Sequence, residues 1–339
     1  MCSVPGDVDM IDTNRVIEKR IKGSALYRDL QHVLGKMCES LGTMAESAGG
    51  RMKTDLSAML LSGGKRLRPI LAYVCYRLGG SREKDILPLM CMLELMHTAS
   101  LIHDDVVDAA DVRRGRSTIN SDRGDFAAVQ SGDFLLAKAM ELLHTYKGMG
   151  INEMLADVSY NMTIGELRQQ EVRYKYGIQS VAAYYDLICK KTALLLAASC
   201  WCGAIAGGMR AEDAQCLFNY GEKLGIAFQL RDDMIDYSDE SGKIPGQDLK
   251  NGVFTLPALI LLERGAPSAV GELLMKQDKT KEEVQSLMEY VKNSGALEQV
   301  ESALWEKSRE AVDELNGFAY GPEKKALSDL VISLAENRA

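Results

Sequence analysis

Proline is scarce in this chain, with 7 copies among 339 residues, and apolar and polar residues rarely alternate with a period of two. The lack of prolines leaves long stretches free to form helices, and the lack of alternation argues against half-buried strands. The long stretches are instead rich in Ala, Leu, Met, Glu and Lys, which favour helices. These observations predict an all-α fold, a multi-helix bundle with a central cavity between facing helices.

Dense runs of basic residues are also missing. The net charge is −8 and the pI is near 5.3, which argues against a nucleic-acid partner. The first 22 residues lack the apolar run of a secretory signal, so we expect a cytoplasmic protein with reduced cysteines. Cys200 and Cys202 do not share a helix face and have no His nearby, so no zinc site is expected there.

No linker divides the chain, and we predict a flexible N-terminus over 1–12 followed by a single domain over 13–339. The uncharged stretch Thr192–Met209 barely reaches the length of a membrane span. Its Ala, Gly and Cys content indicates a buried core helix, so no transmembrane segment is expected. Helices are predicted over 13–46, 52–62, 69–78, 83–108, 125–146, 151–175, 179–208 and 211–237, with loops over 111–123 and 238–257.

Two aspartate-rich motifs are prominent, DDVVD (104–108) and DDMID (232–236). Because residues i and i+4 share a helix face, the first and last aspartates of each motif point the same way. If the two helices face each other, the carboxylates converge and repel one another unless a cation lies between them. All-oxygen ligands suit Mg²⁺, which typically binds one or two carboxylates together with phosphate oxygens. The pair predicts a Mg²⁺-bridged diphosphate site, although one motif alone is more often a solvated acidic helix end.

Two short basic segments accompany the aspartates. In GGKRLRP (63–69), a Gly-Gly turn opening onto a helix exposes backbone N–H groups, with Lys65 and Arg68 beside them. In DVRRGR (111–116), arginines directly follow the first aspartate motif. Taken alone, the first segment is a weak signal, because basic residues near a helix start are usually solvated, and the second is also explained by simple ion pairing. Beside a metal held by carboxylates, the same cations would hold phosphate oxygens.

Together these motifs resemble the trans-isoprenyl diphosphate synthase (polyprenyl synthetase) family, long-chain type. The matching stretches are GGKRLRP (63–69), HTASLIHDDVVDAADVRRGRST (97–118), GDFLLAKA (132–139), GELRQ (165–169), KKT (190–192), GIAFQLRDDMIDY (225–237) and GKIPGQDLKNGVFTLP (242–257). Their order and spacing span most of the chain. The resemblance implies a bundle of the isoprenoid synthase type. It also implies a Mg²⁺-dependent reaction in which isopentenyl diphosphate attacks the cation of an allylic diphosphate, farnesyl or geranylgeranyl, in a homodimeric enzyme.

The resemblance also implies roles for individual residues. Metal ligands are implied at Asp104, Asp108 and Asp232, with Asp105, Asp233 and Asp236 as neighbouring or water-mediated partners. Contacts to the allylic diphosphate are implied for Arg113, Lys191 and Lys243, and contacts to isopentenyl diphosphate for Lys65, Arg68, His97 and Arg114. Thr192, Gln169 and Gln229 are implied at the reacting centre. His103 lies off the metal face and is expected to be structural.

Residues before the first motif predict the product length. One helical turn advances about 5.4 Å, roughly one isoprene unit, and the product tail is expected to run along this helix away from the metals. Short-chain members of the family carry an aromatic residue where this chain has Ala99 and Ser100, and Met96 follows one turn earlier. The depth of the pocket also depends on residues of facing helices, among which Met140 is a candidate. The open path predicts a product longer than C20, a membrane-soluble lipid precursor, unless the small residues merely allow close helix packing.

Several alternatives remain open from the sequence. The chain could be a geranylgeranyl or farnesyl diphosphate synthase, or a catalytic subunit that needs a heteromeric partner. A terpene cyclase is disfavoured, because both aspartate motifs and the Lys65 and Arg68 pair are intact. One departure from the family is Val253, where members often carry lysine, which removes one diphosphate contact and is expected to modulate activity.

Overall fold

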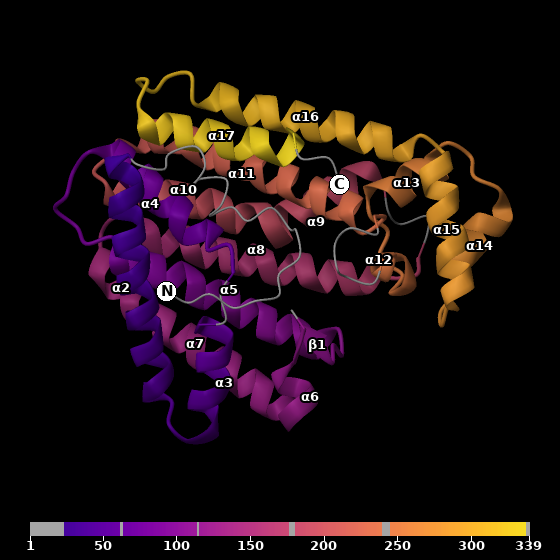
Figure 1. Ribbon diagram of the computed structural model, residues 1–339, viewed down its shortest axis with the longest axis horizontal. Coiled ribbons are helices and arrows are strands. Elements are labelled where there is room, and N and C mark those ends of the chain that lie inside the picture. The colour runs from indigo at the N-terminus through magenta and orange to yellow at the C-terminus, as the bar shows by residue number, and fades with distance from the viewer. Residues whose placement is uncertain (1–23, 62–63, 114, 176–179, 239–244, 337–339) are drawn as a thin grey trace. The chain divides into compact units, whose positions relative to one another are not determined.

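The computed structural model describes residues 24–61, 64–113, 115–175, 180–238 and 245–336 (Figure 1). These residues are mostly helical, and their only strands are β1 (Val112–Arg113) and β2 (Arg116–Ser117), which pair antiparallel. The predicted all-α fold is therefore confirmed. The predicted N-terminal segment 1–12 lies outside the described residues.

The described chain forms two compact units. The first takes residues 24–154 and 199–214, and the second takes residues 155–198 and 215–336. The prediction of a single domain over 13–339 stays a prediction.

The first unit contains the helices that surround the first aspartate motif. They are α2 (Ala25–Ser47), α3 (Gly50–Leu61), α4 (Leu67–Gly79), α5 (Leu87–Val107), α6 (Ile119–Arg123), α7 (Asp125–Leu143), the 3₁₀ turn η1 (His144–Tyr146) and the start of α8 (Ile151–Val172). The α5 helix begins later than predicted because Asp85 accepts a hydrogen bond from the Leu87 N–H at 3.0 Å, and Pro88 suits the first turn. Its core face is fully buried at Leu89, Met92 and Leu95.

The second unit contains the second aspartate motif. It comprises the rest of α8, α9 (Val181–Ile188), the π-helix η2 (Cys189–Ala193), the start of α10 (Leu194–Ala206), most of α11 (Ala211–Ile235), α12 (Gln247–Lys250), α13 (Leu256–Glu263), α14 (Ser268–Met275), α15 (Lys281–Asn293), α16 (Ala296–Glu314) and α17 (Pro322–Glu336). The two C-terminal helices α16 and α17 pack side by side (Figure 1). A buried Arg231 anchors α17, because its guanidinium donates to the Leu334 carbonyl at 2.7 Å.

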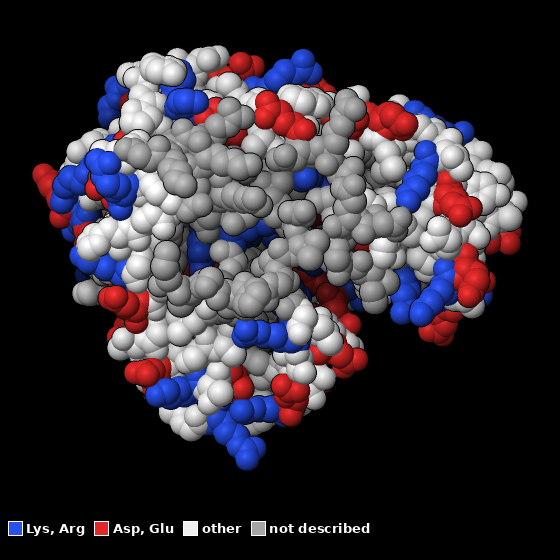
Figure 2. Space-filling model, in the orientation of Figure 1, with Lys and Arg blue, Asp and Glu red and all other residues white. Residues whose placement is uncertain are grey.

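One described stretch, Val181–Ala206, is long and apolar enough to cross a membrane. Most of its apolar window, 61%, is buried inside the protein, as expected for the core helix predicted over Thr192–Met209. The seven described cysteines are free thiols. On the face seen in Figure 2, acidic and basic side chains are interspersed.

Glycines let α10 approach α4 closely within the first unit. A Cβ added at Gly203 would lie 2.1 Å from the Ala72 carbonyl oxygen, and one added at Gly207 would lie 2.3 Å from the Tyr76 carbonyl oxygen. Real Cβ atoms do not come so close to a backbone oxygen, so a side chain at either position must push the helices apart. The small residues of this apolar stretch therefore serve close helix packing.

We expect Gly203→Ala to lower the free energy of unfolding by about 1–3 kcal/mol, because the added methyl overpacks the contact with α4. Gly35→Ala is the matched control, since Gly35 lies inside α2 with no atom near its added Cβ. That control should raise stability by about 0.5–1 kcal/mol, because alanine costs less conformational entropy in a helix. Urea unfolding followed by circular dichroism measures both. Equal stability of Gly203→Ala and the parent would contradict the packing argument.

Candidate active site

The first aspartate motif forms the last turn of α5. The Asp108 N–H donates to the Asp104 carbonyl at 2.8 Å, which places the two side chains one turn apart on the same face. Asp104 is partly buried and Asp108, the C-cap, is exposed. Ala109 then turns left-handed with φ 48°, and the Ala110 N–H returns to the Asp105 carbonyl at 2.9 Å. The helix thus ends within the motif, with its first and last aspartates on one face.

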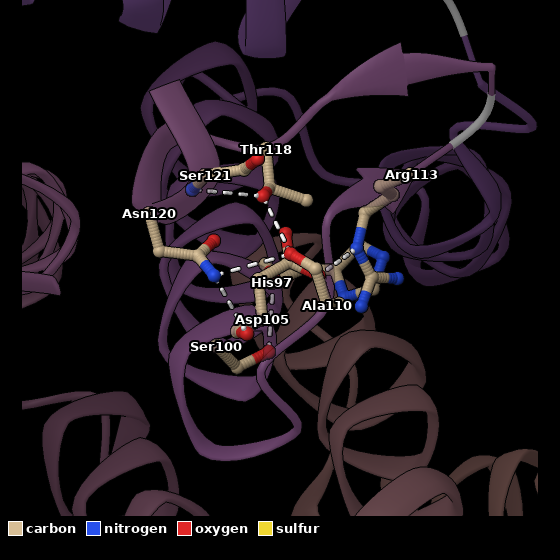
Figure 3. Close-up of polar contacts among 8 residues, drawn as sticks. All are labelled: His97, Ser100, Asp105, Ala110, Arg113, Thr118, Asn120 and Ser121. Carbon is tan, nitrogen blue, oxygen red and sulfur yellow. Dashed lines mark hydrogen bonds and ion pairs between the residues drawn. The ribbon is translucent and has the colours of Figure 1, made fainter. Parts of the chain in front are cut away.

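The middle aspartate, Asp105, points inward. Its carboxylate accepts a hydrogen bond from Arg113 Nε at 2.6 Å, and its side chain is only 4% exposed (Figure 3). Burial raises the pKa of Asp105, and the Arg113 guanidinium only partly offsets this effect. Asp105 therefore anchors Arg113 beside the motif, which supports its predicted place as a neighbour of the metal ligands.

The segment after the motif is more ordered than the predicted loop over 111–123. Arg113 lies on the β1–β2 hairpin, and α6 follows directly. Thr118 caps α6 by accepting from the Ser121 N–H at 3.3 Å and donates to the Ala110 carbonyl at 2.6 Å (Figure 3). Asn120 bonds the carbonyls of Asp105 and Ala110. The loop prediction is wrong here, because these side chains satisfy the backbone groups and hold the hairpin in one position.

The first basic segment is held by its middle arginine. Arg66 adopts the left-handed region, with φ 46° and ψ 34°, and is only 9% exposed. Its guanidinium donates to the Glu94 carboxylate on α5 and to the Leu60 carbonyl at the end of α3. Lys65 and Arg68, on either side, are only partly buried. The ion pair therefore links the segment with Lys65 and Arg68, which are predicted to bind isopentenyl diphosphate, to the helix that carries the first aspartate motif.

The residues predicted to set chain length lie on α5 before the motif. Ala99 is completely buried, whereas Met96 and Ser100 are partly exposed. The Ser100 hydroxyl donates to the His97 carbonyl at 2.9 Å, so it leaves no unsatisfied polar group beside an apolar tail (Figure 3). His97 itself is partly buried. Met140 is 72% exposed on α7, so it does not line an enclosed path within one chain, contrary to our interpretation of it.

His103 packs between α5 and α7. Its Nε2 lies 3.4 Å from the Val129 carbonyl and 3.7 Å from an Asp133 carboxylate oxygen. A Cβ added at Gly132 would lie 2.1 Å from the same nitrogen. These contacts agree with the structural role predicted for His103.

The second aspartate motif lies at the end of α11. Asp232 and Asp236 are partly buried, and Asp233 is only 1% exposed. The Asp236 carboxylate accepts hydrogen bonds from the backbone N–H groups of Gln247 at 3.3 Å and Asp248 at 3.2 Å, at the start of α12. Asp236 thereby fixes the chain that follows the motif, and Asp232 is left as the outer carboxylate.

The buried Asp233 forms part of a hydrogen-bonded cluster. Its two oxygens accept from the Tyr184 hydroxyl at 2.5 Å and from the Gln229 side-chain amide at 2.9 Å. The Gln229 amide oxygen in turn accepts from the Thr192 hydroxyl at 2.9 Å. Burial raises the pKa of Asp233 to about 7, even though these donors favour the ionised form. Thr192 and Gln229, both predicted at the reacting centre, are therefore in direct contact.

Lys191 precedes Thr192 in the π-helix η2. Its ammonium lies 2.6 Å from the Glu166 carboxylate on α8. Burial would raise the pKa of Glu166, but the charge of Lys191 and its hydrogen bonds outweigh burial, and the pKa lies below its ordinary value. A Cβ at Gly165 would lie 3.1 Å from the Lys190 Cβ, so this glycine permits α8 to approach η2. Gln169, one turn further along α8, is partly buried.

The donor set fits a hard divalent cation, because the outer groups Asp104, Asp108 and Asp232 offer only carboxylate oxygens. Within the described residues, no group of three or more His, Cys, Asp or Glu side chains is close enough to hold a metal ion. The two motifs belong to different units, so their joint use of a metal stays a prediction. Arg114 and Lys243, predicted to grip phosphates, lie outside the described residues.

The comparisons with known proteins agree with the motifs. The sequence matches the family described as Polyprenyl synthetase over residues 51–291. The chain belongs to this family. It is 31% identical over 323 residues to "Heptaprenyl diphosphate synthase component 2" of Geobacillus stearothermophilus, covering 93% of this chain and 99% of that protein. The family resemblance inferred from the sequence is confirmed, and with it the assignment as a transferase.

Solved structures of other family members match over nearly the whole chain. A decaprenyl diphosphate synthase from Rhodobacter capsulatus has a TM-score of 0.84 and 30% identity, with 92% of this chain and 98% of that chain covered. A polyprenyl synthase from Caulobacter crescentus CB15, complexed with calcium and isoprenyl diphosphate, has a TM-score of 0.78 and 31% identity, with coverage of 96% and 94%. The family acts on isoprenyl diphosphates and generally depends on a divalent metal.

Sequence reasoning missed four residues that hold the predicted site residues in place. They are Arg66, Glu94, Glu166 and Tyr184. Arg66 and Glu166 lie inside stretches that match the family, so these motifs could have identified them as site residues. Glu94 is a carboxylate in an apolar helix, which by itself suggests a buried partner. Tyr184 lies outside the matching stretches and had no such signal.

Proposed function

We propose that this chain is an all-trans polyprenyl diphosphate synthase. It condenses isopentenyl diphosphate head-to-tail onto farnesyl or geranylgeranyl diphosphate and makes a product longer than C20. The observation that carries the proposal is the pair of intact aspartate motifs, each ending a helix with outer carboxylates, beside anchored cations. Relatives covering most of the chain are named for heptaprenyl, octaprenyl and decaprenyl products, which supports the long-chain type.

The reaction separates charge, and the residues fit that need. The C1–O bond of the allylic diphosphate breaks and leaves an allylic cation with a diphosphate anion. The double bond of isopentenyl diphosphate then forms the new C–C bond, and a proton from its C2 passes to a diphosphate oxygen. Arg113, Lys191 and Lys243 would face the developing negative charge, which stabilises the transition state more than the ground state. Lys65, Arg68, His97 and Arg114 would hold the second diphosphate.

Mg²⁺ is the cation we propose for the outer carboxylates. When bound, it neutralises the leaving diphosphate without proton transfer. Asp104 and Asp108 would hold Mg²⁺ and Asp232 would hold another, while Asp105, Asp233 and Asp236 keep neighbouring groups in position through the contacts described above. The Caulobacter crescentus structure, with its divalent ion and isoprenyl diphosphate, supports this choice.

The direct test incubates purified protein with Mg²⁺, labelled isopentenyl diphosphate and either farnesyl or geranylgeranyl diphosphate. The dephosphorylated products are resolved by mass, and EDTA serves as the control. We expect a ladder that ends at one product longer than C20. A product of C15 or C20 would favour the shorter-chain alternatives, and a cyclic hydrocarbon without incorporated label would indicate a cyclase.

A subunit that requires a partner is the second candidate, because the similar Geobacillus stearothermophilus protein is named component 2. Well-folded protein that incorporates no label on its own would favour this candidate. Activity restored by a fraction of host extract would then identify the missing partner.

We expect Ser100→Phe to shorten the main product, because Ser100 lies one turn before Asp104 on a partly exposed face of α5. An aromatic ring there would block the path along the helix. Ser100→Ala is the matched control, since it removes the hydroxyl bonded to His97 without adding volume. Mass analysis of the products decides the question. Unchanged product length in Ser100→Phe would mean that the tail does not pass this face.

An exposed apolar stripe on α7 supports the proposed homodimer. Phe126, Val129 and Met140 are 76%, 41% and 72% exposed, and their spacing places them on one side of the helix, with the exposed Asp133 between them. Large apolar side chains on a surface helix commonly mark a contact with another protein. Contact between the α7 helices of two copies would bury these side chains in both copies.

We expect Phe126→Glu combined with Met140→Glu to convert a dimer into a monomer, because it places charges in the buried centre of the contact. Tyr320→Glu is the control, since Tyr320 is 85% exposed and lies outside α7. Sedimentation equilibrium measures the mass of each variant. A double variant that remains dimeric would place the contact elsewhere.

A further inference from the structure

Three hydrogen bonds link Tyr184 to the predicted reacting centre within the second unit. The Tyr184 hydroxyl donates to Asp233 Oδ2, the Gln229 Nε2 donates to Asp233 Oδ1, and the Thr192 hydroxyl donates to Gln229 Oε1. Tyr184 and Asp233 are buried, at 5% and 1% exposure, whereas Gln229 and Thr192 are partly exposed. The chain therefore runs from a closed, buried end to an open end at Thr192.

The groups at the buried end decide which atom donates and which accepts in each of these hydrogen bonds. The ionised Asp233 carboxylate offers only acceptors, and it is the NH₂ of Gln229 that faces it. The amide oxygen of Gln229 then faces Thr192 and accepts the proton of the Thr192 hydroxyl. One oxygen of Asp233 accepts a hydrogen bond from Tyr184 and the other accepts one from Gln229. If the Gln229 amide were reversed, its oxygen would face a carboxylate oxygen.

The π-helix brings the two ends of the chain to one side. In an uninterrupted α-helix, residues eight apart, such as Tyr184 and Thr192, differ in direction by about 80°. A π-helical turn takes up one extra residue, which sets the following residues back by about 100°. The π-helix η2 (Cys189–Ala193) begins between these two residues and contains Thr192, so part of this rotation falls before Thr192. Both side chains can therefore reach α11, where Gln229 and Asp233 lie one turn apart.

We propose that Tyr184 is a positioning residue for the transfer reaction, acting through Asp233 and Gln229 to set the direction of the Thr192 hydroxyl. This inference rests on the proposed function. With its proton donated to Gln229, the Thr192 oxygen turns its lone pairs away from Gln229, toward the open end. A fixed oxygen dipole of this sign stabilises an allylic cation, whereas the opposite direction would present a proton to it. Tyr184 touches neither substrate nor metal in this scheme.

The test compares single-turnover rates of the first condensation, which separates chemistry from product release. Tyr184→Phe removes one oxygen and leaves the ring, which packs edge-to-face against Tyr185 at 5.5 Å. We expect this rate to fall roughly 10-fold to 100-fold, with KM values for both substrates within about twofold of the parent. Thr192→Val, which removes the hydroxyl itself, should lower the rate at least as much.

The double variant distinguishes positioning from a purely structural role. If Tyr184 acts only through the Thr192 hydroxyl, Tyr184→Phe costs nothing further once Val replaces Thr192, and the double variant matches Thr192→Val. If Tyr184 merely stabilises the fold, the two losses multiply. Multiplied losses, or a full rate in Tyr184→Phe, would overturn the proposal.

Gln229→Met tests the same series of hydrogen bonds if Tyr184→Phe folds poorly. It cuts the link between Asp233 and Thr192 while the Tyr184–Asp233 bond remains. We expect a loss similar to that of Tyr184→Phe, and a double variant with Thr192→Val that matches Thr192→Val alone. A double variant slower than Thr192→Val would also overturn the proposal. A well-folded parent protein that is inactive on its own would instead count against the proposed stand-alone synthase and favour the partner-requiring candidate, so the two failures are distinguishable.

Discussion

Asp104→Ala should lower the rate of isopentenyl transfer by about 10³-fold or more while the protein stays folded. Removing one carboxylate ligand forfeits several kcal/mol of transition-state stabilisation by the metal, and each 1.36 kcal/mol is a factor of ten in rate. Asp104 is only partly buried, in the last turn of α5, so its truncation creates no core cavity. Rates across a Mg²⁺ titration, with circular dichroism of the same samples, measure the effect. Near-normal turnover would refute the metal assignment.

Asp105→Asn is the matched comparison, one residue away in the same turn. The structure predicts a different result, because the Asp105 carboxylate is buried and bonded to Arg113. Losing that charge should lower the free energy of unfolding by roughly 1–3 kcal/mol, the usual cost of a charge-assisted hydrogen bond. The remaining activity should exceed that of Asp104→Ala and should need little additional Mg²⁺. If both variants lost activity equally at every Mg²⁺ concentration, the outer and inner aspartates would not differ in role.

The helical framework could be predicted because its signals are local. Apolar periodicity and turn residues such as Gly79 and Gly80 place most helices to within a few residues. The same local geometry predicts that Asp104 and Asp108 share a face, as the structure shows. Specific motifs then supplied the candidate ligands, since their residue types and order are rare in combination.

The supporting contacts could not be predicted, because they depend on partners distant in sequence. The π-helix at η2 has no composition signal in Cys189–Ala193, and it determines where Thr192 points. The β1–β2 hairpin forms because Thr118 and Asn120 bond backbone groups of the preceding turn. Tyr184 meets Asp233 across 49 residues of chain. The apolar periodicity of a helix identifies its buried face, but it does not identify the residues that pack against that face.

Arg66 is the clearest case of a long-range partner, and Arg66→Met should be among the most damaging substitutions outside the proposed metal ligands. It would leave Glu94 buried, at 7% exposure, without its guanidinium partner. Breaking one side of a buried ion pair typically costs about 3–5 kcal/mol. We expect a loss of that size in urea unfolding. The left-handed backbone of Arg66 adds to the cost, because the ion pair helps hold it there.

The double variant Arg66→Met/Glu94→Leu isolates the cause of that loss. Replacing both partners with apolar residues of similar volume removes the unpaired charge, and such exchanges are often neutral or stabilising. Stability should therefore recover to within about 1 kcal/mol of the parent, while Glu94→Leu alone leaves Arg66 unpaired and should remain unstable. Failure of the double variant to recover would mean that the hydrogen bond to the Leu60 carbonyl is the dominant contribution. Recovery with a raised KM for isopentenyl diphosphate would mean that the ion pair serves the neighbouring Lys65 and Arg68 more than the fold.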